Sequence, residues 1–159
     1  MKQKSLSNWL KFIIVGVGIC GLIVYALVVP IMGQSIAYEY PESSYCFWPW
    51  LIFIWATAVP CYVALVFAWK IAVNIGADRS FSVPNAKYLK WIALSAAADA
   101  AFFFIGNLVF FFLSMSHPSV VLFSFIVVFA GVAVSVASAA MSHLVMKAAV
   151  LQEQSDLTI

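Results

Sequence analysis

Charged residues are scarce in this chain. Only 9% of its 159 residues are Asp, Glu, Lys or Arg, whereas 65% are hydrophobic, and the mean hydropathy is +1.06. An ordinary soluble domain has about 25% charged residues, which keep its surface in water. The composition therefore excludes a water-soluble fold and indicates a protein embedded in a lipid bilayer.

Motifs for catalysis and metal binding are also missing. The sequence has no phosphate-binding loop, no His-Glu-x-x-His and no nucleophile elbow. Its three cysteines lack the spacing of a zinc site or a Cys-x-x-Cys redox pair. The net charge of +2 is too small for a nucleic-acid groove. We therefore expect no enzyme, no cofactor, no metal site and no direct binding of nucleic acid.

Four apolar runs are each long enough to cross a membrane. A transmembrane helix needs about 20 apolar residues to span a hydrocarbon core about 30 Å thick. Consecutive phenylalanines, as at 102–104 and 110–112, break the alternation that a membrane β-barrel requires. We predict an all-α protein whose residues 1–159 form one integral membrane domain. It is a four-helix transmembrane bundle of two helical hairpins, with spans at about 12–32, 48–69, 91–113 and 120–146.

Positive charges mark one end of these spans. The eight Lys and Arg residues precede the first span, separate the second from the third, or follow the fourth, and the other two connections have none. Under the positive-inside rule, this end faces the cytoplasm. The prediction is a multi-pass protein of a bacterial inner or plasma membrane, with both termini in the cytoplasm.

Asp99 is the one Asp, Glu, Lys or Arg in the middle of a predicted span. A charged side chain there costs about 2.5–3.5 kcal/mol, so it should face the bundle interior and have a partner. At 1.5 Å per residue it lies about 12 Å from the cytoplasmic end. Proline and serines on other spans fall at a similar depth, and Ser95 lies one turn away on the same face. We predict an intramembrane polar layer of Asp99, Ser95, Ser135, Ser138 and Pro60.

Two interpretations of this layer remain open. In one, Asp99 is a neutral carboxylic acid that holds helices together by hydrogen bonds. In the other, it carries a proton or binds a cation, although the sequence shows no second titratable partner within the membrane. Cys61, at nearly the same depth, is interpreted as a small buried hydrophobic side chain.

The fourth span has a face of small residues. Gly131, Ser135, Ser138 and Ser142 follow one another at intervals of four, three and four, which places them on one side of a helix. Small side chains allow helices to approach closely in a membrane, where no hydrophobic effect drives association. We expect this face to pack against the third span or against a second copy of the chain.

The connection between the second and third spans is the largest predicted cytoplasmic segment. It runs from Asn74 to Pro84, with Ser82 as the expected N-cap of the next helix and Pro84 in its first turn. Its basic residues and those just after it are candidates for docking a soluble partner: Arg79, Lys87 and Lys90.

Two stretches resemble family 2975 of bacterial domains of unknown function. They are Ser80-Phe81-Ser82 followed by Lys87-Tyr88-Leu89-Lys90, and the run from His117-Pro118 to the final Asp156-Leu157-Thr158-Ile159. Members of that family are similar in length, have four spans with a proline in the second, and end in a sequence similar to Asp-Leu-Thr-Val. The resemblance implies an architecture and supplies no catalytic residues. Asp99 is not among the family's characteristic positions.

The resemblance also implies a partner. Family members are often encoded near a small helix-turn-helix transcription regulator, so the expected function is a sensor or regulatory partner that acts through protein contacts. Besides the lipid bilayer, the expected partners are such a regulator or a second copy of the chain. The C-terminal Asp-Leu-Thr-Ile is suited to adding a strand to a partner's sheet. The alternative is a small transport or peptide-immunity protein that uses the polar layer around Asp99.

Overall fold

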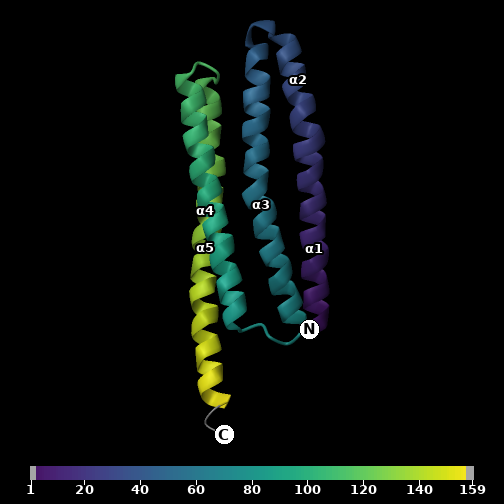
Figure 1. Cartoon of the computed structure of the whole chain (residues 1–159), viewed down its shortest axis with the longest axis vertical. Coiled ribbons are helices and arrows are strands. Elements are labelled where there is room, and N and C mark those ends of the chain that lie inside the picture. Colours follow the sequence, from purple (N-terminus) through teal and green to yellow (C-terminus); the bar gives the residue numbers. More distant parts are fainter. Residues whose placement is uncertain (1–2, 157–159) are drawn as a thin grey trace.

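The computed structural model describes residues 3–156, which are almost entirely helical and contain no strand. Four helical segments are long and apolar enough to cross a membrane, so the predicted all-α fold class is confirmed (Figure 1). The first segment is one rod made of α1 (Gln3–Ile23), the π-helical η1 (Val24–Val28) and α2 (Val29–Glu39). A 3-10 turn, η2 (Pro41–Cys46), leads into α3 (Phe47–Gly76), α4 (Val83–Phe112) and α5 (Pro118–Asp156).

The helices form an open row. The α1 rod packs on α3, α3 packs on α4, and α4 packs on α5, as in Figure 1. Within residues 3–156, no other pair of these long helices brings Cα atoms within 8 Å of each other. Each outer helix therefore has one helical neighbour and exposes most of its apolar surface, whereas α3 and α4 each have two.

The two ends of the row differ in charge. The start of α1, the connection between α3 and α4, and the end of α5 lie together at the bottom of Figure 1. The Lys and Arg residues of the described chain all fall in these segments or in the adjoining turns of α3 and α4. We call these segments and turns together the basic end. The opposite end has Glu39 and Glu42 and no Lys or Arg.

Pro30 accounts for the π-helical segment. The Val29 amide donates to Val24 O, five residues back, as in a π-helix. In that register the partner of Tyr25 O would be the nitrogen of Pro30, which has no hydrogen. The indole Nε1 of Trp55 donates to this carbonyl instead, at 2.8 Å. A side chain of α3 thus satisfies the backbone group that proline leaves open in the first span.

Small residues form the interface between α4 and α5. Ala86, Ala93 and Ala100 recur every seventh residue along α4 and are at most 7% exposed. On α5, Ser142 Oγ donates to Ala86 O at 2.6 Å and Ser135 Oγ donates to Ala93 O at 2.8 Å. The small-residue face of the fourth span therefore packs on the third span.

Aromatic residues form the interface between α3 and α4. Phe53 is 7% exposed, and its ring contacts those of Phe102, Phe103 and Phe110 at centroid distances of 5.2 to 5.8 Å. The ring also lies against Gly106, where a Cβ atom would overlap it. A glycine on α4 therefore makes room for a large side chain of α3.

Candidate functional site

Asp99 projects from α4 toward α3. Its Oδ2 accepts a hydrogen bond from Cys61 Sγ at 3.5 Å, whereas its Oδ1 is buried and has no hydrogen-bond partner within residues 3–156. The Tyr25 hydroxyl lies 3.4 Å from Thr57 Oγ1 and also interacts with Cys61 and Asp99. These four residues, which we call the polar cluster, join η1, α3 and α4 near the middle of the candidate membrane spans.

The polar cluster differs from the predicted polar layer. Ser135 bonds to the backbone of Ala93, on the α5 side of α4, and α5 does not contact α3, so neither Ser135 nor Ser138 joins Asp99. Ser95 lies one turn from Asp99 on α4, and within the described residues no hydrogen bond joins their side chains. Pro60 is half-buried beside Cys61 in α3. The open row of helices is the reason, because α5 packs on the Ala93 side of α4 and does not reach the side of α4 that meets α3.

Two members of the polar cluster differ from the sequence prediction: Cys61 was misjudged, and Tyr25 was missed. Cys61 was expected to be buried, but it is exposed and directs its thiol to Asp99. Tyr25 lies in the π-helical segment, and its position five residues before Pro30 was the available signal. Asp99 therefore has two neighbours with exchangeable protons, and its free Oδ1 can accept one more donor.

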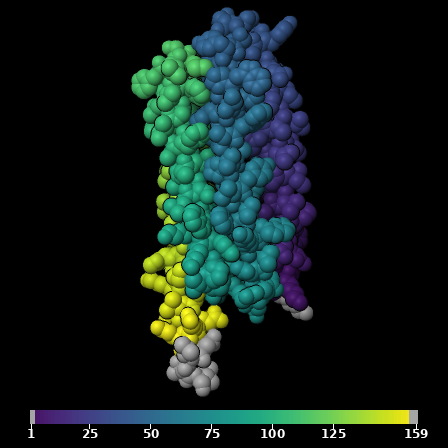
Figure 2. All heavy atoms as spheres, viewed as in Figure 1, coloured from purple at the N-terminus to yellow at the C-terminus, as the bar shows by residue number. Residues whose placement is uncertain are grey.

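A second candidate site is an open groove at the basic end. Its volume is about 600 Å³, and it lies between α1, the connection of α3 to α4, and the end of α5. Figure 2 shows the end of α5 extending beyond the other helices here. The lining residues are Gln3, residues 78–84, Ala149, Gln152 and Glu153.

Asn85 holds the wall of this groove in place. Its side chain is 1% exposed, and its Nδ2 donates to Arg79 O at 3.1 Å and to Ser80 O at 2.9 Å. Its Oδ1 accepts from Asn74 Nδ2 at 2.7 Å. The connection is therefore anchored to both helices that it joins. Sequence reasoning missed Asn85, although an Asn directly after Pro84 in an apolar helix was a visible signal.

α4 begins where the sequence predicted, but Ser82 does not cap it with a side-chain hydrogen bond. Ser82 precedes the helix with extended backbone angles, φ −137° and ψ 150°, and Pro84 lies in the first turn. The Ser82 side chain makes no capping hydrogen bond, and its Oγ is buried without a partner in the described chain. Asn85, three residues later, bonds to the connection instead.

The predicted docking residues separate into two places. Arg79 is exposed and lines the groove. Lys87 and Lys90 are exposed on α4 and are not part of the groove lining. The groove instead combines Arg79 with Glu153 of α5, which the sequence alone did not bring together.

Comparison with known proteins identifies the family. Residues 31–159 match the family model described as protein of unknown function DUF2975. The chain belongs to the DUF2975 family. It is 27% identical over 153 residues to the uncharacterized membrane protein YoaS of Bacillus subtilis strain 168, a match that covers 95% of this chain and 96% of that protein. No solved structure matches the chain.

The family assignment confirms the resemblance predicted from the sequence. It also agrees with the four candidate spans, so the chain is a membrane protein of a family whose function is unknown, with a bacterial relative.

Proposed function

We propose that this DUF2975 protein is a regulatory membrane protein that binds a soluble partner protein at its basic end. The observation that carries the proposal is the exposed apolar surface beside the groove. Phe81, which lines the groove, is 59% exposed, and Val150 and Leu151, between the groove-lining Ala149 and Gln152 of α5, are 42% and 65% exposed. Apolar side chains gathered beside a polar groove are typical of a protein-binding surface.

The length of α5 supports a position of this surface outside the bilayer. The bond between Ser142 and Ala86 sets the register of the hairpin, so the start of α4 lies opposite about residue 145. Residues 146–156 of α5 therefore extend past the first turn of α4, by about 16 Å at 1.5 Å per residue. A partner can reach Val150 and Leu151 without entering the membrane.

The charges support a cytoplasmic location for the partner. All Lys and Arg residues of the described chain lie at the basic end, and the positive-inside rule assigns such an end to the cytoplasm. In this orientation both termini are cytoplasmic and the protein lies in the plasma membrane of a bacterium. A small helix-turn-helix regulator, the partner implied by the family resemblance, has access to the groove there. The predicted strand-forming tail at residues 157–159 lies outside the described residues.

Site-specific photocrosslinking in native membranes tests the proposal. A crosslinking amino acid at Phe81 or Leu151 should capture a cytoplasmic protein, and the same amino acid at Tyr38, which is 89% exposed at the opposite end, should not. Leu151→Asp should abolish capture through Phe81 while leaving the amount of membrane-inserted protein unchanged. Crosslinks to a second copy alone, or to lipid alone, would contradict a soluble partner.

Cysteine accessibility tests the orientation separately. In a background without native cysteines, Ser80→Cys should react with a membrane-impermeant maleimide only after the cells are opened. Ser43→Cys, in the turn at the opposite end, should react in intact cells. The reverse pattern would place the groove outside the cytoplasm.

A second candidate function is supported by the polar cluster. The unpartnered Oδ1 of Asp99, with Cys61 and Tyr25 beside it, suits transfer of a proton or binding of a small cation. A transport or peptide-immunity protein is the corresponding proposal. Asp99→Asn in sealed vesicles should then abolish proton flux while the chain stays folded. If flux is absent from the wild-type protein, Asp99 serves as a hydrogen-bonding group between helices.

A further inference from the structure

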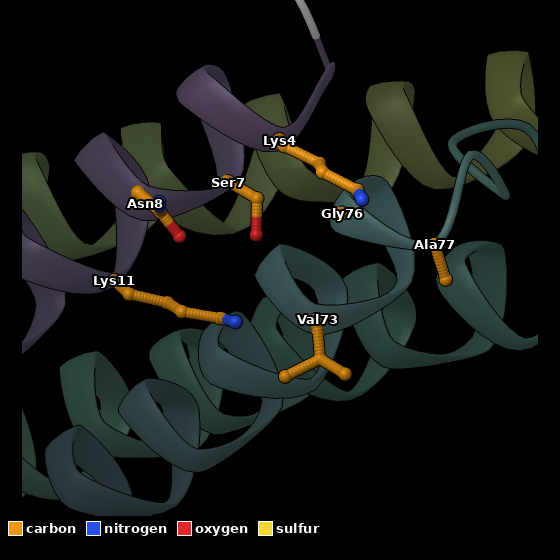
Figure 3. Close-up of a pocket in the computed structure, with 7 residues that line it drawn as sticks. All are labelled: Lys4, Ser7, Asn8, Lys11, Val73, Gly76 and Ala77. Atoms are coloured by element: carbon orange, nitrogen blue, oxygen red, sulfur yellow. The ribbon is translucent and has the colours of Figure 1, made fainter.

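A second hollow lies at the basic end, between the first turns of α1 and the last turn of α3. Its volume is about 330 Å³. It is separate from the groove, with which it shares no lining residue. Figure 3 shows the residues that line it: Lys4, Ser7, Asn8, Lys11, Val73, Gly76 and Ala77.

A close helix crossing creates this hollow. Ser7 is 1% exposed, and its Oγ donates to Ala72 O at 2.7 Å. A Cβ atom on Gly76 would lie 2.7 Å from that Oγ, so the crossing depends on the absence of a side chain at position 76. Because residues at intervals of three, four and seven share one helix face, the same crossing directs Lys4, Asn8 and Lys11 toward α3.

The hollow is positively charged. In Figure 3 the amino groups of Lys4 and Lys11 extend from α1 on either side of Ser7 and Asn8. No Asp or Glu lines it. Lys11 Nζ also lies 5.8 Å from the centroid of the Trp69 ring. Two ammonium groups and an amide around one space provide donors for a single anionic oxygen group.

Apolar side chains next to the hollow face the surroundings of the helices. Phe12, which follows Lys11 on α1, is 72% exposed, and Trp69 on α3, whose ring contacts Lys11, is 40% exposed. Tryptophan at the end of a span is typical of the headgroup layer. The hollow therefore lies where lipid headgroups are expected.

We propose that this hollow binds the phosphate of an anionic phospholipid, with its acyl chains against Phe12 and Trp69. Basic sites between transmembrane helices at the cytoplasmic side are suited to such headgroups. Lys4 and Lys11 neutralise the phosphate, and Asn8 donates a hydrogen bond to it. The lipid bridges α1 and α3 at the point where Ser7 joins them. This inference does not depend on a soluble partner at the groove.

Lipid binding to the purified full-length chain in detergent tests the proposal by native mass spectrometry. The probes are dioleoyl phosphatidylglycerol and dioleoyl phosphatidylcholine. We expect Lys4→Gln/Lys11→Gln to lower the affinity for phosphatidylglycerol about thirtyfold. The variant removes two lysines, and each contributes to the attraction of an anionic lipid. Phosphatidylcholine binding should not change. Lys4→Arg/Lys11→Arg should retain the affinity for phosphatidylglycerol. Retention would show that the loss in the glutamine variant comes from the missing charges.

The matched control is Lys87→Gln/Lys90→Gln, which removes the same charge from the same end at exposed positions outside the hollow. It should lower the affinity less than about twofold, because those lysines act only through the screened surface potential. An equal loss in both double variants would overturn the site. Displacement of the lipid by inorganic phosphate at equal concentration would overturn the lipid as its occupant.

Discussion

The two helical hairpins are held together by different chemistry. In the α4–α5 hairpin, small residues bring two backbones close, and Ser135 and Ser142 bond across the short gap. In the hairpin of the α1 rod with α3, the helices are close at the crossing by Ser7, and beyond it long side chains reach across a wider gap. Trp55 donates to Tyr25 O at 2.8 Å and Tyr62 donates to Gly18 O at 2.8 Å.

The difference follows from the absence of a hydrophobic driving force between helices in lipid. Association then depends on close packing or on hydrogen bonds between helices. The α4–α5 interface depends mainly on close packing, to which serine hydrogen bonds are added, so its stability should be sensitive to added side-chain volume. The α1–α3 interface depends more on donors to backbone carbonyls, so it should be sensitive to their loss.

The largest expected effect is that of added volume between α4 and α5. A Cβ atom on Gly131 would lie 3.0 Å from the Cβ of Ala100, so Gly131→Leu has to separate the helices. We expect the free energy of unfolding in mixed detergent micelles to fall by about 3 kcal/mol. Gly16→Leu is the control, because nothing lies within 4 Å of a Cβ there. Equal stability of the two variants would show that the hairpin tolerates separation.

A smaller effect is expected where the hairpins meet. Gly106→Ala places a methyl group against the Phe53 ring, and we expect a loss of about 2 kcal/mol in the same unfolding measurement. In a Phe53→Leu background the cost should shrink, because the smaller side chain leaves room. A cost that is the same in both backgrounds would mean that Phe53 is not the obstacle.

The hydrogen bond of Trp55 can be tested with the proline that makes it necessary. Trp55→Phe should cost about 1 kcal/mol, because Tyr25 O loses its donor. In a Pro30→Ala background the new amide at position 30 can serve that carbonyl, so the cost should fall toward zero. Trp48→Phe, at a 63% exposed position, is the control substitution. If the costs of the two substitutions simply add in the double variant, the hydrogen bond of Trp55 does not depend on Pro30.

The smallest effect is expected for the serine bonds. Ser135→Ala removes the donor to Ala93 O but keeps a small side chain, so we expect a loss of about 0.6 kcal/mol, the average for such bonds in membranes. Ser135→Leu should cost several times more if volume is what matters in this interface. If the alanine and leucine variants lose equal stability, hydrogen bonding rather than close approach dominates the α4–α5 hairpin.

Much of the fold was predictable because helices in lipid must satisfy their own backbone groups. Apolar length predicted four spans, and the spacing of Gly131, Ser135 and Ser142 predicted a packing face. The same sequence did not tell which neighbour each face meets. Tyr25 and Cys61 were therefore not assigned to Asp99, and Ser135 was assigned to it although its hydroxyl bonds to Ala93 O.

The sequence by itself determined what depends on one helix at a time: the apolar spans, the concentration of Lys and Arg at one end, and the face of small residues. These follow from local composition and from the period of the helix. Only the tertiary structure decided that the helices form an open row and that Asp99 meets Cys61. It also decided that Asn85 anchors the wall of the groove and that Lys4 and Lys11 flank one hollow. The physical reason is that each of these arrangements depends on how side chains from helices far apart in sequence fit together.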